Sequence, residues 1–219
     1  MKVTAVVPAH NESLHLAGVL QDLRRFVDEV IVVDDGSEDN TGLIAATGGA
    51  IVLRHLVNRG QGAALETGTR AALKRGADVM VHFDADGQFC AEEIPEMIAP
   101  IIKGAADVVR GSRFLGKRSA LPFLKRYLIM PVGRVVERIF TGLDLTDSHN
   151  GFRALSAGAA GRLHITLDRM AHNTEIIRSA RRCGLRIVEV PVTIKYHEFG
   201  QGVGGGLEIV KDLLMQRWI

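Results

Sequence analysis

The sequence has few cysteines, few aromatic residues and no long apolar run. Its two cysteines, Cys90 and Cys183, stand in no metal-binding or redox spacing. This argues against a disulfide framework and fits a reducing compartment. No stretch approaches the roughly 18 consecutive apolar residues that a membrane-spanning helix needs. The N-terminus runs directly into a strand-like segment at residues 3–7 and shows no signal-peptide pattern, so we expect a cytoplasmic protein.

What the sequence does contain is a repeated order of strand, polar loop and helix. Hydrophobic residues make up 47% and charged residues 24% of the 219 residues, as in ordinary globular domains. The repeated order predicts a mostly parallel sheet with helices on both faces, whose functional residues line the carboxyl ends of the strands. Strands are expected at residues 2–7, 30–33, 51–53, 79–83, 107–110 and 186–195. Because the last contains Pro191, it should lie at a sheet edge or be irregular.

The charges are distributed unevenly along the chain. Residues 1–102 contain 8 Lys/Arg and 15 Asp/Glu, whereas residues 103–219 contain 19 Lys/Arg and 10 Asp/Glu. An acidic first half suits a cation site, and a basic second half suits anionic partners.

An acidic pair follows the predicted strand at residues 79–83. Asp84 and Asp86 are separated by one residue, and Gln88 follows. Because unpaired carboxylates are costly inside a buried strand, we expect them just beyond its carboxyl end. Carboxylate and amide oxygens are hard ligands that suit Mg²⁺ or Mn²⁺, usually together with substrate phosphates. The alternatives are an acidic turn and an Asp that caps the next helix.

Several nucleotide-binding motifs are absent. The loop after the first predicted strand reads Pro-Ala-His-Asn-Glu at residues 8–12 and contains no G-x-G-x-x-G, which argues against a dinucleotide-dependent dehydrogenase. A P-loop is missing as well. A sugar-nucleotide pyrophosphorylase would also need a glycine-rich first loop.

The second half contains a basic amphipathic stretch. Residues 116–138 carry six Lys/Arg and one Glu, with an apolar stripe at helical spacing that Pro131 should kink. Such a helix is typical of one lying in a lipid interface, but the stripe could instead cover the sheet. A last amphipathic helix at residues 207–219 could join it, or could pair with another subunit in a homo-oligomer.

Five sequence blocks occur in order and in register with the predicted strand ends: VVPAHNES (6–13), VVDDGSEDNT (32–41), NRGQGAALETG (58–68), FDADGQF (83–89) and DSHNGFRALS (147–156). Together they resemble family 2 glycosyltransferases of the GT-A fold, and most of all the dolichol-phosphate-mannose synthase and polyprenyl-phosphate glycosyltransferase branch. The resemblance implies one Rossmann-like domain over residues 1–219 with amphipathic C-terminal helices. Residues 1–113 would bind the nucleotide sugar and residues 114–219 the acceptor.

The resemblance also implies roles for individual residues. Asp86 and Gln88 would bind the metal, with Asp84 near the ribose or joined to the metal through water. His10 stands where the family commonly has a tyrosine, and its imidazole would take over the stacking contact with the nucleotide. The residues expected to contact the nucleotide sugar are Pro8, Ala9, His10, Glu12, Asp34, Asp35, Gly60, Gly62, Asp84, Ala85, Asp86 and Arg113.

On the acceptor side, the resemblance points to Asp147 and Arg113 as catalytic residues. Asp147 could be a general base, an acceptor-orienting residue or a structural cap. Arg113 would bind phosphate through its guanidinium fork. Arg153 and Glu175 are weaker acceptor-binding candidates, and a surface position is expected for His197.

The family suggests an inverting, Mg²⁺- or Mn²⁺-dependent transfer of a sugar from a nucleotide sugar, GDP-mannose or a UDP-sugar, to a polyprenyl phosphate. The protein would then be peripheral on the inner face of the cell membrane, with no nucleic-acid partner. Two alternatives are transfer to a hydroxyl of a glycan or small molecule, and a non-catalytic nucleotide-sugar-binding module.

Overall fold

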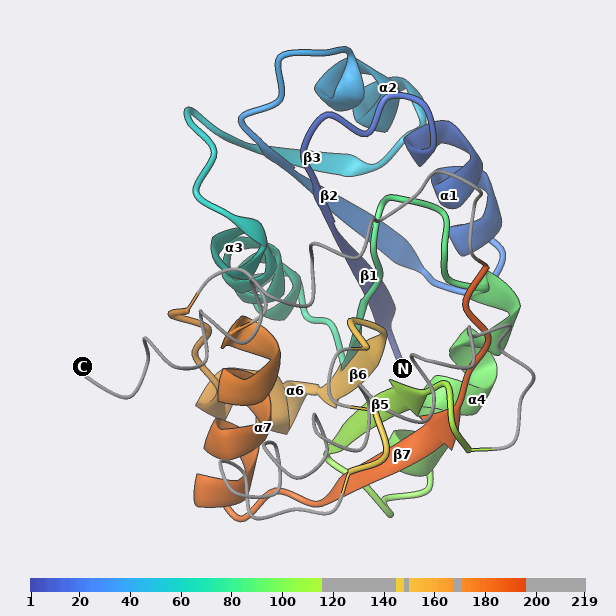
Figure 1. The fold of residues 1–219 in the computed structure, drawn as a ribbon, viewed down its shortest axis with the longest axis vertical. Coiled ribbons are helices and arrows are strands. Elements are labelled where there is room, and N and C mark those ends of the chain that lie inside the picture. The colour runs from blue at the N-terminus through green and yellow to red at the C-terminus, as the bar shows by residue number, and fades with distance from the viewer. Residues whose placement is uncertain (116–144, 148–149, 168–170, 196–219) are drawn as a thin grey trace, which may run out of the picture.

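The computed structural model describes residues 1–115, 145–147, 150–167 and 171–195 (Figure 1). Its centre is a seven-stranded sheet in the order β3-β2-β1-β4-β6-β5-β7. The strands are β1 (Val3–Ala9), β2 (Glu29–Asp35), β3 (Ile51–His55), β4 (Val79–His82), β5 (Val108–Ser112), β6 (Arg153–Ser156) and β7 (Ile187–Pro191).

The sheet is mostly parallel, as the sequence predicts. Strand β6 alone among these seven runs antiparallel to its neighbours, β4 and β5. Strand β7 lies at one edge and ends at Pro191, the position expected for a proline that cannot donate to a strand on its other side. Strands from both halves of the chain share the sheet.

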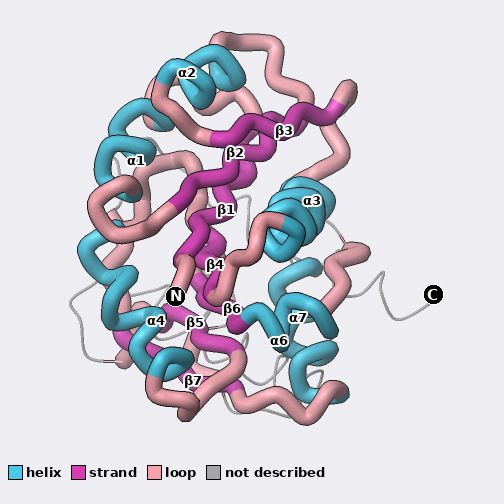
Figure 2. The backbone as a smooth tube through the Cα atoms, turned by 180° about the vertical axis from the view of Figure 1, so that it is seen from behind, coloured by secondary structure: helices cyan, strands magenta, loops and turns pink. Residues whose placement is uncertain are grey.

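Helices cover both faces of the sheet, which Figure 2 shows edge-on. The helices are α1 (Leu16–Leu23), α2 (Thr41–Thr47), α3 (Gln61–Lys74), the short 3₁₀ helix η1 (Ala91–Glu93), α4 (Ile94–Ile102), α6 (Ala157–Arg162) and α7 (Ala171–Arg182). The side chains of a strand alternate between the two faces. Val3, Ala5 and Val7 therefore pack in one apolar cluster with α1 and α4, while Val6 packs in the other with α3, α6 and α7.

None of the helices within the described ranges is long and apolar enough to cross a membrane. The basic stretch at 116–138, His197 and the helix expected at 207–219 lie outside the described residues. The interpretation of those segments therefore stays a prediction from the sequence.

Three phenylalanines fix the loop that follows β4. Phe83 and Phe89 flank the acidic loop, and Phe152 precedes β6; their ring centroids lie 5.1 to 5.4 Å apart. Edge-to-face and offset pairs of this kind contribute about 0.5–1.5 kcal/mol each beyond their buried area. Because both ends of the acidic loop are anchored in this cluster, Asp84 and Asp86 are held just beyond the carboxyl end of β4.

Gly36, just after β2, has a backbone conformation that other residues rarely adopt. Its φ is +71°, and a Cβ there would lie 2.6 Å from backbone atoms of Val57 and Asn58. We expect Gly36→Ala to lower stability by about 3 kcal/mol, or Tm by about 6–12 °C, because left-handed strain and a backbone clash combine. The matched control is Gly18→Ala inside α1, where no atom lies within 4 Å. Gly18→Ala should raise the free energy of unfolding by up to about 1 kcal/mol. Equal thermal melts of the two variants would contradict this account.

Candidate functional site

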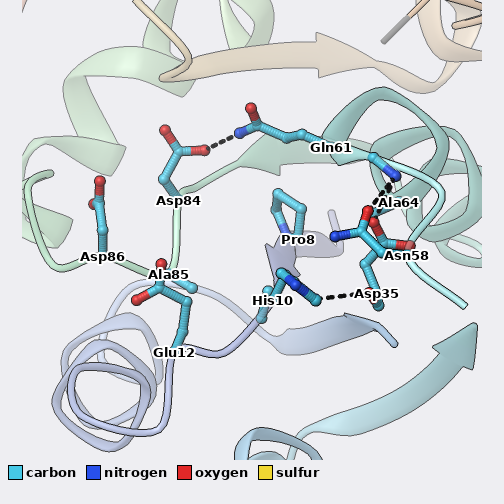
Figure 3. A pocket seen from close by; sticks show the side chains of 12 residues that line it. Pro8, His10, Glu12, Asp35, Asn58, Gln61, Ala64, Asp84, Ala85 and Asp86 are labelled. Atoms are coloured by element: carbon cyan, nitrogen blue, oxygen red, sulfur yellow. Dashed lines mark hydrogen bonds between the residues drawn. The ribbon is translucent and has the colours of Figure 1, made fainter. Parts of the chain in front are cut away.

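A cavity of about 600 Å³ opens at the carboxyl ends of β1, β2 and β4. Figure 3 shows its walls: the loop after β1 on one side, the acidic loop after β4 on another, and the start of α3 opposite. It is lined by Pro8, Ala9, His10, Glu12, Asp35, Asn58, Gly60, Gln61, Ala64, Asp84, Ala85 and Asp86.

Most of the residues expected to contact the nucleotide sugar lie in this lining. Among the described residues, Asp34, Gly62, Gln88 and Arg113 are predicted donor-site or metal-site residues that do not line it. Conversely, Asn58, Gln61 and Ala64 line the cavity and were not singled out from the sequence. The signal was present, because all three belong to the block at residues 58–68 and the first two are polar side chains at the start of a helix.

The two carboxylates after β4 have different surroundings. The half-buried Asp84 accepts a hydrogen bond from Gln61 Nε2 at 2.8 Å. Asp86 Oδ1 accepts one from the backbone N–H of Gln88 at 3.0 Å. Burial, followed by the negative charge of Asp86, raises the pKa of Asp84 to about 7, although Arg153 opposes the shift. Burial and Asp86 likewise raise the pKa of Glu12. Three acidic groups from the loops after β1 and β4 thus face one cavity and repel one another.

A divalent cation would relieve this repulsion, and the oxygen ligands fit Mg²⁺ or Mn²⁺. Within the described residues, however, no three carboxylate, imidazole or thiol groups gather closely enough to hold a metal by themselves. An ion held by Asp84 and Asp86 would therefore take further oxygens from a bound diphosphate. The Gln88 side chain does not line the cavity; its backbone N–H supports Asp86 and its carbonyl accepts from Lys195 N at 2.8 Å.

The raised pKa of Asp84 makes a pH-dependent prediction for the metal-free protein. The ordinary pKa of an aspartate is 3.8, so the folded protein holds the Asp84 proton more tightly than the unfolded chain does. This proton binding stabilises the folded state fully below about pH 4, and the stabilisation is lost as the pH rises through 7. Because Asp84 is partly exposed, solvent screens part of this effect. We expect Asp84→Asn to raise the free energy of unfolding by about 1–2 kcal/mol at pH 8, or Tm by about 3–6 °C. It should differ little from wild type at pH 4.5. Thermal melts in a chelator measure both, and an equal gain at the two pH values would contradict the assignment.

The loop after β1 presents His10 to the cavity. His10 Nδ1 donates to the carbonyl of Asp35 at 2.9 Å, and Asn11 Nδ2 donates to Nε2 at 3.3 Å. Asn11 has a φ of +57° and also binds Ser37 Oγ and the N–H of Glu38, which joins the loops after β1 and β2. The exposed imidazole is thus held by its edge, with a face available to a planar ligand.

The two aspartates that end β2 differ in their surroundings. The Asp34 carboxylate is buried; it accepts from Ser37 N at 2.9 Å and lies 3.5 Å from Arg54 Nε, so it stabilises its own loop. Asp35 lines the cavity. Gly62, inside α3, is buried.

Asp147 is completely buried and is bound by Arg113. Its two oxygens accept from Arg113 Nη2 and Nε at 2.7 Å each, and Oδ2 also accepts from the N–H of Arg113 at 3.0 Å. Burial acts to raise the pKa of Asp147, but the hydrogen bonds and charge of Arg113, with help from Arg110, outweigh it and hold that pKa below its usual value. Glu189 on β7 accepts from the N–H groups of Thr146 and Asp147, which fixes the pair to the sheet.

The two weaker acceptor candidates have other partners. Arg153 begins β6, is buried, and donates to the Gly151 carbonyl and to Asn173 Oδ1. Burial and the like charge of Arg110 lower its pKa to about 9 against the effect of Asp84, so it stays charged at neutral pH. Glu175 on α7 accepts from the N–H groups of Thr166 and Leu167, each at 2.9 Å, and stabilises that loop.

A cavity at the carboxyl ends of a mostly parallel sheet, with two acidic residues after the central strand, fits the class of GT-A glycosyltransferases that use nucleotide sugars. Residues 4–163 match the family model described as glycosyl transferase family 2, and the chain belongs to that family. The protein is therefore an enzyme that transfers a sugar from a nucleotide sugar.

Two relatives cover almost the whole chain. An undecaprenyl-phosphate mannosyltransferase of Micrococcus luteus is 35% identical, over 100% of this chain and 94% of that protein. A UDP-N-acetylglucosamine–dolichyl-phosphate N-acetylglucosaminyltransferase of Methanococcus voltae is 32% identical, over 96% and 94%. The predicted resemblance to the polyprenyl-phosphate branch is confirmed by these relatives.

A solved structure supports the fold. The glucosyl-3-phosphoglycerate synthase of Mycobacterium tuberculosis, crystallised with Mn²⁺, uridine diphosphate and glucosyl-3-phosphoglycerate, superposes with a TM-score of 0.73. The match covers 99% of this chain and 79% of that one at 22% identity. The predicted GT-A fold is confirmed.

Proposed function

We propose that this protein transfers a sugar, with inversion, from a nucleotide sugar to a polyprenyl phosphate in a reaction that needs Mg²⁺ or Mn²⁺. The observation that carries the proposal is the cavity that Asp84, Asp86 and Glu12 line together, where their negative charges repel one another. Such a cavity fits a cation and the diphosphate that accompanies it. The nature of the acceptor is supported by relatives named for undecaprenyl and dolichyl phosphates.

Different residues of the cavity would bind different parts of the nucleotide sugar. His10 and Asp35 would bind the base and ribose on one wall, and Asp84 and Asp86 would hold the metal on the other. When bound, the metal supplies Lewis-acid neutralisation of the departing diphosphate. Strand β5 is parallel to β4, so Arg113, just beyond its carboxyl end, lies at the same sheet edge as the cavity and would bind the acceptor phosphate.

The Asp147–Arg113 pair favours a phosphate acceptor over a hydroxyl. A hydroxyl acceptor needs a general base, whereas a phosphate is already an anionic nucleophile. Asp147 is a poor base in this arrangement, because it is buried, has a lowered pKa and binds Arg113 through both oxygens. We propose that Asp147 orients Arg113, so that its guanidinium meets the acceptor in one geometry.

The membrane is part of the proposal, because a polyprenyl phosphate resides in one. We propose peripheral binding at the inner face through the basic stretch at residues 116–138, an assignment that rests on its sequence alone.

The test is a donor and acceptor screen. The protein would be incubated with UDP-, GDP- and dTDP-sugars, Mn²⁺ or Mg²⁺, and a polyprenyl phosphate in detergent. Formation of a lipid-linked sugar is the expected result. Transfer only to glycan or small-molecule hydroxyls would favour the first alternative. Nucleotide-sugar binding without turnover on any acceptor would overturn the enzymatic proposal in favour of a binding module.

A further inference from the structure

A buried histidine stands behind the nucleotide wall of the cavity. His55 on β3 lies opposite Asp35 on the neighbouring parallel strand β2, and both side chains are buried. His55 Nδ1 donates to Asp35 Oδ1 at 2.6 Å. His55 does not line the cavity, so it contacts the ligand space only through Asp35.

The Asp35 carboxylate organises the next loop of the wall. Oδ1 also accepts from the N–H of Arg59 at 3.0 Å, and Oδ2 accepts from the N–H of Gly60 at 2.7 Å. Gly60 has a φ of +90° and ends the loop that carries Asn58 into the cavity. A carboxylate has about four acceptor positions. Three are taken by protein donors, so about one is left to face a ligand.

The other nitrogen of His55 reaches the helix behind the wall. His55 Nε2 lies 2.9 Å from Thr67 Oγ1 on α3, the helix whose first turn places Gln61 and Ala64 in the cavity. One imidazole therefore joins the end of β2 to α3. Without it, the Asp35 carboxylate could rotate about its last bond and turn its remaining acceptor position away from the cavity.

We propose that His55 is a positioning residue for the donor nucleotide. It sets the plane of the Asp35 carboxylate, and through Asp35 it fixes the loop at residues 58–60, so that one carboxylate acceptor faces an N–H or hydroxyl of the nucleoside. The proposal rests on the proposed function of the cavity. It concerns donor affinity and not the chemical step.

Two polar substitutions separate positioning from packing. An asparagine amide at position 55 reaches the place of Nδ1 and can still donate to Asp35, whereas a glutamine amide reaches the place of Nε2 and serves Thr67 instead. We expect His55→Asn to keep the nucleotide Kd within about threefold of wild type. His55→Gln and His55→Leu should raise it at least about tenfold, and Thr67→Val, which removes only the link to α3, should raise it less than either.

The experiment is calorimetric titration of each variant with UDP, GDP and dTDP in Mn²⁺, followed by donor KM and kcat in the transfer assay. A rise in donor KM with kcat within about threefold of wild type is the expected pattern. Wild-type nucleotide affinity in His55→Leu, or equal losses in His55→Asn and His55→Gln at unchanged Tm, would overturn the inference alone. Failure of the wild type to bind any of the three nucleotides would overturn the proposed function, and this inference with it.

Discussion

Replacing Asp86 with asparagine should lower sugar transfer by about a thousandfold, or about 4 kcal/mol of transition-state stabilisation. The amide keeps an oxygen that can accept from the N–H of Gln88, so the loop should keep its conformation. The negative charge that would face the proposed metal is lost. The same variant also removes the negative charge that adds to the effect of burial in raising the pKa of Asp84. Initial rates at saturating donor, with a titration of Mn²⁺, measure the effect.

The matched control is Asp22→Asn, which removes an exposed carboxylate on α1 far along the chain from the acidic loop. It should retain wild-type rates. A chelator should reduce wild-type activity to the level of Asp86→Asn, and added Mn²⁺ should restore the wild type only. Full activity of Asp86→Asn in a chelator would show that the carboxylate holds no catalytic metal.

Breaking the Asp147–Arg113 pair should have the next largest effect. We expect Asp147→Asn and Arg113→Lys each to lower kcat/KM for the acceptor phosphate by about a hundredfold or more, because both destroy the two-point contact at 2.7 Å. Donor KM should change less than threefold. Because the two side chains act as a unit, the double variant should lose little more than either single one.

The control for this pair is another arginine–carboxylate contact. Arg75 donates to Glu29 through Nε and Nη2 at the opposite, amino-terminal end of β2, and Arg75→Lys should leave the rate unchanged. Loss of a buried partner can also cost about 3–5 kcal/mol of stability, so Tm must be measured for each variant. A folded Asp147→Asn protein with wild-type activity would leave Asp147 only a structural role. Loss of an acidic limb from the rate profile would instead indicate a general base.

Much of this molecule could be predicted from local sequence patterns. The short apolar run before Asp84 and Asp86 predicts a buried strand with the acids beyond its end, and β4 with its acidic loop has that form. Similarly, Pro191 placed β7 at an edge. These predictions succeeded because each depends on neighbouring residues and on one general rule for parallel sheets.

Other features depended on contacts between distant residues. The sequence gives no local sign that Asp35 rather than Asp34 faces the cavity, because the two are adjacent carboxylates and the choice follows from Ser37, Arg59 and Gly60. The helix α6 was missed because its composition, with Gly158 and Gly161, is poor for a helix; Ser156 caps it by accepting from Ala159 N. Glu175 was a candidate by resemblance, and only the fold showed its loop partners.

The single antiparallel strand has a consequence for how the enzyme is made. Strand β6 separates β4 from β5, so β5 and β7 reach the sheet only through it. A chain still emerging from the ribosome and ending before residue 153 would carry β4 with a bare edge and β5 without its neighbour, an arrangement prone to pairing with other chains. We therefore expect residues 1–113, the part predicted to bind the nucleotide sugar, not to fold stably without β6. Strand β6, which begins at Arg153, must insert between β4, which ends at His82, and β5, which ends at Ser112. We expect that long-range closure to be the slow, chaperone-sensitive step of synthesis.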